Sequence, residues 1–258
     1  MARKVIAFDL DGTLAPSKSA LPDRMGAALR ALLEKYHVCV ISGGKFEQFE
    51  KQLLGNLKAD TRHLEKLHIM PTCGTRYYGY DIDNKTWKQV YAEDFNAYEK
   101  QKIISEVKKA AEHLGLVEKK VYGEVIEDRG SQISWSALGQ DIVDELGEEG
   151  IRQKEEWDPD NKKKLKMVKY LTPLLDEFEV RAGGTTTVDI TKKGIDKAYG
   201  MAKLMEILDV KKEDIFFIGD KIIEGGNDFP VKAMGIDTLQ ISTWHETALV
   251  VEAIVNVT

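Results

Sequence analysis

The stretch Lys4-Val5-Ile6-Ala7-Phe8-Asp9-Leu10-Asp11-Gly12-Thr13-Leu14 decides how the rest of the chain is interpreted. Its apolar half is typical of a buried strand, which delivers the carboxylates of Asp9 and Asp11 into a turn. Gly12 can take the positive φ that residues with side chains avoid. Two like charges so close are stable mainly when a cation lies between them or one carboxyl is protonated. A turn without any ligand has the same local sequence, so the stretch alone leaves both interpretations open.

The composition is that of a globular protein without a nucleic-acid surface. The 258 residues, 43% of them hydrophobic, suffice for one large or two modest domains. A net charge of −6 argues against a nucleic-acid partner. No apolar run approaches the roughly 18 residues of a membrane span, and the N-terminus enters a strand rather than a signal peptide. We expect a cytoplasmic protein with no membrane partner, in which Cys39 and Cys73 are structural.

Apolar strands and helices alternate at the start of the chain, which predicts a βαβ unit. Apolar residues at helical spacing over 25–33 precede a second buried strand at 38–41. That strand ends at Ser42-Gly43-Gly44, where a hydroxyl and two glycines can present a backbone N–H to an anion at the start of a helix over 45–54. A glycine turn without a ligand remains the alternative here.

The middle of the chain breaks this alternation. Two extended runs flank Asp83-Asn84 and predict a hairpin, at which we place the start of a second, β-rich α+β module. A helix over 103–114, extended runs at 121–127 and 131–136, a helix opened by Asp158-Pro159, and strands at 178–181 and 185–190 follow. The expected division is 1–84 for the first part of a core domain, 85–186 for the inserted module and 187–258 for the second part of the core.

The last third returns to the α/β pattern. Lys197 lies early in a helix over 195–208, and a buried strand at 215–219 ends at Asp220. A glycine-hinged loop then brings Asp228 back near Asp220. Ligands of open parallel sheets bind at the carboxyl ends of strands, near the switch in strand order. The side chains expected to converge there are Asp9, Asp11, Ser42, Lys197, Asp220 and Asp228.

Four motifs, in this order, resemble those of the haloacid dehalogenase superfamily of phosphotransferases. The resemblance implies a Rossmann-like, doubly wound α/β core with a parallel sheet and an inserted α+β cap. The insert between the second and third motifs resembles the C2-type cap of subfamily IIB, as in Cof-type sugar phosphatases and eukaryotic-type phosphomannomutases. The motifs are Asp9-Leu10-Asp11-Gly12-Thr13, Ser42-Gly43-Gly44, Lys193-Gly194-Ile195-Asp196-Lys197, and Gly219-Asp220 with Gly225-Gly226-Asn227-Asp228.

The chemistry of phosphoryl transfer fits these residue types. A phosphate dianion repels the carboxylate of Asp9, so attack needs a divalent cation and a positive group such as Lys197. Mg²⁺ suits an oxygen-only site. The resemblance implies that Asp11 protonates the leaving oxygen and then acts as the base for the water or hydroxyl group that cleaves a phosphoaspartate. The implied metal ligands are Asp9, the Asp11 backbone carbonyl, Asp220 and Asp228; Ser42, Gly43, Gly44 and Asn227 are implied around the phosphorylated substrate.

The cap distinguishes a phosphatase from a mutase. Arg129 matches an arginine of the mutase cap, and Thr187 and Asp189 match its sugar-binding Ser and Asp. Gln140 falls where the mutases have a second arginine, and Lys18 falls near one of their core arginines. Replacing an arginine by glutamine removes the charge and the bidentate fork that would hold a second phosphate. We therefore expect a Mg²⁺-dependent phosphohydrolase of a small phosphorylated sugar. A phosphohexomutase is the alternative, and a phosphosugar-binding regulator without turnover is disfavoured because Asp9 and Asp11 are both present.

Overall fold

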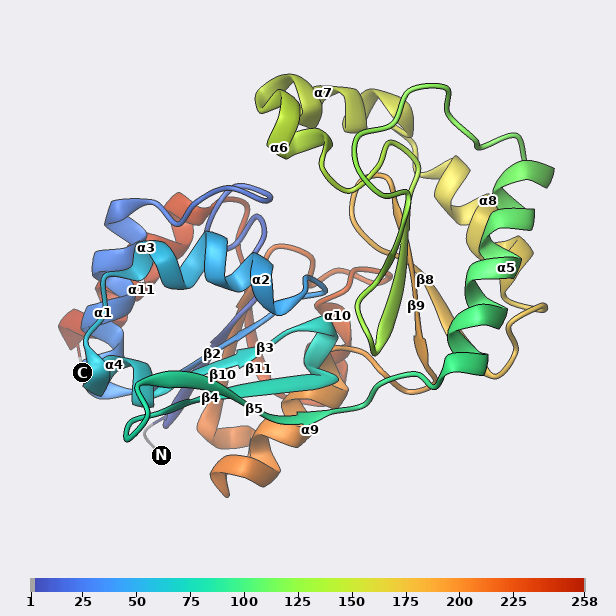
Figure 1. The fold of residues 1–258 in the computed structure, drawn as a ribbon. Helices are drawn as coiled ribbons and strands as arrows, with labels where there is room; N and C mark the ends of the chain where they lie inside the picture. Colours follow the sequence, from blue (N-terminus) through green and yellow to red (C-terminus); the bar gives the residue numbers. More distant parts are fainter. Residues whose placement is uncertain (1–2, 258) are drawn as a thin grey trace. The chain divides into compact units, whose positions relative to one another are not determined.

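The computed structural model describes residues 3–257, which form two compact units (Figure 1). The first unit, the core, contains the residues up to Ala92 and those from Ile195 onward. The second unit, the cap, is Glu93–Gly194. Within residues 3–257, no helix is both long and apolar enough to span a bilayer.

The core is built on a seven-stranded sheet whose strand order reverses beside its first strand. Its order is β11-β10-β1-β2-β3-β4-β5. The five strands from β11 to β3 are parallel, and β4 and β5 form an antiparallel hairpin at the edge. The chain builds outward from β1 through β2 and β3, then returns to add β10 and β11 on the other side of β1. This is the expected doubly wound sheet, and its switch point lies between β1 and β10. The strands are β1 Val5–Phe8, β2 His37–Ile41, β3 Leu67–Met70, β4 Arg76–Asp81, β5 Thr86–Ala92, β10 Ile215–Gly219 and β11 Asp237–Gln240.

Helices cover both faces of the core sheet, which is why its strands are almost continuously apolar. In β1, Ile6 and Phe8 pack among residues of α1 and α11, whereas Val5 and Ala7 pack among residues of α9. Figure 1 shows α1, α3 and α11 on one side of the sheet and α9 on the other. The core helices are α1 Asp23–Lys35, α2 Phe46–Phe49, the π-helix η1 Glu50–Leu54, α3 Gly55–Leu57, α4 Thr61–Glu65, the 3₁₀-helix η2 Thr72–Gly74, α9 Lys197–Leu208, the 3₁₀-helix η3 Lys212–Asp214, α10 Phe229–Ala233 and α11 Trp244–Val257.

The cap is an antiparallel sheet in the order β6-β7-β9-β8 with helices α5 and α8 packed on one face. Alternation along β7 separates the two faces: Ile133 and Trp135 belong to the apolar cluster under the helices, and Ser134 points the other way. Figure 1 shows α5 and α8 beside β8 and β9. The elements are α5 Ala97–His113, β6 Ile126–Asp128, β7 Gln132–Ser136, α6 Ile142–Leu146, α7 Glu148–Trp157, α8 Lys162–Leu171, β8 Phe178–Ala182 and β9 Thr187–Lys192.

The boundaries between the units differ from those expected at 84/85 and 186/187. The predicted hairpin is present, but β5 pairs with β4 in the core sheet, and Tyr78 of β4 stacks on Phe46 with ring centroids 3.9 Å apart. Strand β9 pairs with β7 and β8, so it belongs to the cap sheet. The contacts therefore divide after Ala92 and after Gly194.

Two local expectations in the cap also need correction. Of the run expected to be extended at 121–127, only Ile126 and Glu127 lie in a strand. The helix expected to open at Asp158-Pro159 begins at Lys162 instead. The Asp158 carboxylate still binds that helix terminus, since it accepts hydrogen bonds from the backbone N–H groups of Lys163 at 2.9 Å and Lys164 at 3.0 Å.

Candidate active site

Asp9 lies at the switch point of the core sheet, directly after β1. Its backbone N–H donates to the carbonyl of Ile218 in β10 at 3.1 Å, which holds the chain in register beyond the last strand residue. The side chain is 3% exposed, and its Oδ2 accepts a hydrogen bond from the Thr13 hydroxyl at 3.3 Å. The turn that follows requires Gly12, whose φ is +85°.

Lys197 provides the cation for this carboxylate. It is the first residue of α9, whose N-terminus is capped by Asp196 through the N–H of Tyr199 at 3.1 Å. The Lys197 side chain is fully buried and donates to Asp228 Oδ1 at 2.6 Å and to Asp9 Oδ1. Burial alone would lower the pKa of the Lys197 ammonium, but the two carboxylates raise it above its ordinary value. The group therefore stays charged in the interior.

Asp9, Asp220 and Asp228 form an acidic cluster that could hold a divalent cation. Each offers a carboxylate oxygen, and these atoms lie within 4.8 Å of one another. Two glycines make the approach possible, since a Cβ at Gly12 would lie 2.7 Å from Asp220 Oδ2 and one at Gly219 would lie 2.5 Å from Asp228 Oδ2. An all-oxygen donor set of this kind fits Mg²⁺.

Burial and mutual repulsion disturb the ionisation of this cluster. Burial raises the pKa of Asp9 to about 7. The positive charge of Lys197 lowers this pKa, whereas the negative charges of Asp228 and Asp220 raise it further. Burial also raises the pKa of Asp220. Three carboxylates beside the Lys197 ammonium leave an excess of negative charge, which is the condition that favours binding of a second cation.

The second predicted motif follows β2, the strand next to β1. Ser42 is 5% exposed, and its Oγ accepts the N–H of Gly44 at 3.3 Å. Its carbonyl accepts the N–H of Cys73 at 2.9 Å, which fixes the turn. Because β1 and β2 are parallel, Ser42, Gly43 and Gly44 lie at the carboxyl ends of the strands, as Asp9 does. Asn227 is exposed on the loop that precedes Asp228.

The partners of Asp11 were missed by the sequence analysis. Gln48 Nε2 donates to Asp11 Oδ2 at 2.9 Å, and Gln52 Nε2 donates to Asp11 Oδ1 at 3.0 Å. The backbone N–H of Lys18 adds a third hydrogen bond, to Oδ1, at 2.7 Å. The available signal was the spacing of the two glutamines, which places them on one face of the helix predicted at 45–54.

The predicted cap residues lie on the polar face of the cap sheet, opposite α5 and α8. Ser134 Oγ donates to Asp189 Oδ1 at 2.5 Å, and these two residues are direct partners across β7 and β9. Arg129, in the turn after β6, donates to Glu127 Oε2 at 2.7 Å and to Gln140 Oε1 at 3.3 Å. Burial raises the pKa of Asp189, and the nearby guanidinium opposes this shift. Thr187 of β9 pairs with Ser136 of β7, two residues along the strands from the pair of Asp189 and Ser134.

Glu127 is a further polar residue of this face that the sequence analysis did not single out. It pairs with Ser134 across β6 and β7, so it shares a row with Ser134 and Asp189. Its carboxylate is 13% exposed and binds the Nε edge of Arg129. The cation predicted to bind substrate is therefore already paired with a carboxylate.

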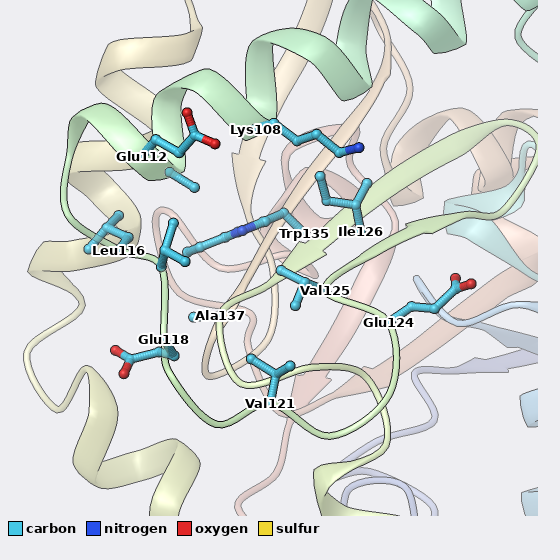
Figure 2. Close-up of a pocket in the computed structure, with 12 residues that line it drawn as sticks. Lys108, Glu112, Leu116, Glu118, Val121, Glu124, Val125, Ile126, Trp135 and Ala137 are labelled. Atoms are coloured by element: carbon cyan, nitrogen blue, oxygen red, sulfur yellow. The ribbon is translucent and has the colours of Figure 1, made fainter.

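A separate pocket of about 500 Å³ lies on the apolar side of the cap (Figure 2). Its lining comes from the C-terminal part of α5, the following loop, β6 and β7, and includes Trp135. Lys108 brings a positive charge to this lining, opposed by the carboxylates of Glu112, Glu118 and Glu124. In the described part of the chain, the residues that line the pocket include none of the predicted site residues. The apolar pocket is thus distinct from the acidic cluster.

Comparisons with known proteins agree with these motifs. The sequence profile of the family described as haloacid dehalogenase-like hydrolase matches residues 6–229. The phosphomannomutase of Encephalitozoon cuniculi is 27% identical over 237 residues, covering 89% of this chain and 84% of that protein. Phosphomannomutase 1 of Homo sapiens is 25% identical over 240 residues, covering 90% of this chain and 84% of that protein.

Solved structures show the same fold at low sequence identity. N-terminally truncated IMP-nucleotidase of Plasmodium falciparum superposes with a TM-score of 0.69 and 20% identity, covering all of this chain and 71% of that one. A haloacid dehalogenase-like hydrolase from Bacteroides thetaiotaomicron gives a TM-score of 0.62 and 17% identity, with 98% and 99% of the two chains covered.

Proposed function

Since the chain belongs to the haloacid dehalogenase-like hydrolases, we propose that it is a Mg²⁺-dependent phosphohydrolase of a phosphorylated sugar that works through a phosphoaspartyl intermediate. The observation that carries the proposal is the buried Lys197 ammonium between Asp9 and Asp228, with Asp220 completing the cluster. A binding protein has no need of a buried carboxylate held beside a cation at the switch point of the sheet. The regulator without turnover is correspondingly disfavoured.

In this mechanism Asp9 is the nucleophile. One of its carboxylate oxygens attacks phosphorus while the bond to the leaving sugar oxygen breaks. Lys197 offsets the negative charge on the nucleophile and the equatorial phosphoryl oxygens, and the Ser42 hydroxyl donates to one of those oxygens. Asp11 gives a proton to the leaving oxygen and then takes one from the water that hydrolyses the intermediate.

Asp9, Asp220 and Asp228 would hold the Mg²⁺, with the Asp11 backbone carbonyl as a further ligand. The ion supplies positive charge that reduces the repulsion between the phosphate dianion and the carboxylates. The protein's own contribution is rigidity: Lys221 N–H donates to Asp228 Oδ2 at 3.0 Å, and Thr13 holds Asp9 Oδ2. The acidic cluster is thus positioned before substrate binds.

The polar face of the cap supports a hydrolase in preference to a mutase. A mutase has to bind a second phosphate, for which free guanidinium groups are the natural partners. Arg129 is paired with Glu127 here, and the neutral Gln140 occupies the neighbouring position. Together with Ser134, Thr187 and Asp189, this face suits the hydroxyl groups of a sugar.

The proposal is tested by Asp9→Asn, which keeps the shape of the side chain and removes the nucleophile. We expect loss of phosphate release from 4-nitrophenyl phosphate in Mg²⁺ buffer, and loss of the acid-stable phosphoprotein trapped from the wild type. Asp83→Asn, in the exposed hairpin turn, is the matched control and should retain both. Undiminished turnover by Asp9→Asn would refute the assigned nucleophile.

A phosphohexomutase is the second candidate, favoured by the phosphomannomutases among the relatives. The two activities separate when the protein is incubated with mannose 1-phosphate and a hexose bisphosphate activator. A hydrolase releases orthophosphate faster than mannose 6-phosphate forms. The opposite order would establish the mutase.

A further inference from the structure

The Asp11 carboxylate is held by three N–H groups. Within residues 3–257, its donors are the side-chain amides of Gln48 and Gln52 and the backbone N–H of Lys18. The two amides also bind each other, since Gln48 Nε2 donates to Gln52 Oε1 at 2.7 Å. Both amides turn their nitrogens toward Asp11, which suits its carboxylate form because a carboxylate only accepts hydrogen bonds. The amide orientations are therefore determined by the network.

These hydrogen bonds distinguish the two oxygens of Asp11. A carboxyl group offers about four acceptor positions, two on each oxygen. Oδ1 accepts from both Lys18 N and Gln52 Nε2, which fills it, whereas Oδ2 accepts from Gln48 Nε2. Among these contacts within residues 3–257, the remaining lone pair is on Oδ2. Oδ2 is therefore the oxygen with an acceptor position left for a reacting group.

The backbone fixes the glutamines in place. Gln52 is 2% exposed and lies in the π-helix η1, where its carbonyl accepts the N–H of Leu21 at 2.8 Å. π-helical turns are uncommon and are found frequently at functional sites. Gly44 leaves room for the other amide, because a Cβ there would lie 2.2 Å from Gln48 Oε1. Helix and glycine turn together aim both amides at Asp11.

We propose that Gln48 and Gln52 are positioning residues that orient the Asp11 side chain for its acid–base role, and that Oδ2 is the oxygen they leave for the reacting groups. The inference rests on the phosphohydrolase proposed above. In the first step the bond from Asp9 to phosphorus forms, the bond from phosphorus to the bridging oxygen breaks, and its electron pair stays on that oxygen. The proton on Asp11 Oδ2 passes to this oxygen, so an alcohol leaves and Asp11 becomes a carboxylate.

The second step returns the proton. The oxygen of a water molecule bonds to phosphorus, the bond between Asp9 and phosphorus breaks, and orthophosphate leaves. Asp11 Oδ2 takes the proton that the water loses. The same oxygen acts in both steps, so the carboxyl group does not need to rotate between them.

The test uses leaving groups of different basicity. The alcohol departs in the first step, so kcat/KM reports the transfer of the phosphoryl group to Asp9. A strongly basic leaving group depends most on receiving a proton from Asp11, so its kcat/KM should respond most when Asp11 is misplaced. Gln48→Met and Gln52→Met remove the amides while keeping the length of the side chain. We expect kcat/KM for phenyl phosphate to fall about 10- to 100-fold, and that for 4-nitrophenyl phosphate to fall less than about threefold.

Three further variants make the outcome unambiguous. Asp11→Asn should show the same selectivity more strongly, and Glu47→Met, exposed on the same helix, should match the wild type on both substrates. Urea midpoints verify folding. An equal loss on both substrates, or no loss on either, would overturn the positioning role. Asp9→Asn, measured in parallel, separates this failure from failure of the proposed function, because only the latter leaves Asp9→Asn active.

Discussion

Acidification should destabilise the core through one buried histidine. His68, in β3, is 5% exposed and lies between two partners: its Nε2 is 3.0 Å from His37 Nδ1, and its Nδ1 is 2.8 Å from the Tyr77 hydroxyl. Burial lowers the pKa of His68 to about 3, and the neighbouring His37 contributes to this lowering. The imidazole is therefore neutral in the folded protein between pH 5 and pH 7.5.

The sign and size of the effect follow from linkage. The pKa is lower in the folded state than the value of about 6.5 in the unfolded chain, so the unfolded chain binds the proton more tightly. The contribution of neutral His68 to the free energy of unfolding is fully present above pH 6.5 and is lost as the pH falls below this value. At pH 5 the loss is about 2 kcal/mol, from about 1.4 kcal/mol per pH unit over about 1.5 units. Because pH 5 lies well above the folded pKa, the loss at this pH depends almost entirely on the pKa of the unfolded chain.

Urea unfolding at pH 7.5 and pH 5 measures this loss as a difference in the free energy of unfolding. Carboxylates also titrate in this range, so the comparison is between the wild type and His68→Gln, which keeps hydrogen-bonding atoms beside His37 and Tyr77. The variant should lose about 2 kcal/mol less than the wild type between the two pH values. The matched control is His245→Gln, at an exposed position, which should behave as the wild type. Equal pH dependence in His68→Gln and the wild type would refute the reasoning.

Three further predictions concern the catalytic core. Lys197→Met leaves two buried carboxylates without their shared cation and should lower the free energy of unfolding by about 3–5 kcal/mol in urea titrations without metal; a loss no larger than that of the exposed-site control Lys193→Met would contradict the buried ion pairs. EDTA should abolish phosphate release. Mg²⁺ at 100 times its dissociation constant should raise the free energy of unfolding by about 2.7 kcal/mol, and equal stabilisation of Asp220→Asn would place the ion elsewhere. Gly12→Ala puts a side chain at φ +85° and should cost about 1–2 kcal/mol while weakening Mg²⁺ in calorimetric titrations; unchanged affinity would argue against close approach of the turn to Asp220.

The strands that carry the acidic residues could be predicted because their signal is local. Strands β1 and β10 are covered by helices on both faces, so each is a short apolar run that ends in an aspartate. The fold rule for open sheets then brings Asp9 and Asp220 together, although more than two hundred residues separate them. The structure places them beside each other, with Asp228 and Lys197.

The unit boundaries could not be predicted, because they depend on which strand pairs with which. Strand β5 does not alternate between buried and exposed residues, and its sequence fits the start of a new module as well as a strand of the core. Its assignment to the core follows from pairing with β4 and from the stacking of Tyr78 on Phe46. Strand β9 is ambiguous for the same reason. Its partner β8 precedes it directly, but its other partner, β7, is separated from it in the sequence by α6, α7, α8 and β8. The local sequence of a strand does not determine which distant strand it pairs with.

Gly44 shows why the support of the reacting groups is harder to predict than the groups themselves. In the sequence it is one of two glycines that can present an N–H to phosphate, and this interpretation treats each motif separately. In the structure its N–H donates to Ser42 Oγ, and the space left by its missing side chain admits the amide of Gln48. That amide binds Asp11, so a glycine of the second motif leaves room for a side chain that contacts the first motif. The i, i+4 spacing of Gln48 and Gln52 places both glutamines on one helix face, but polar pairs with this spacing also occur on solvated helices, so the spacing alone does not single them out. A motif therefore identifies candidate residues for the reaction, whereas the hydrogen bonds that hold Asp11 come in part from side chains that carry no motif.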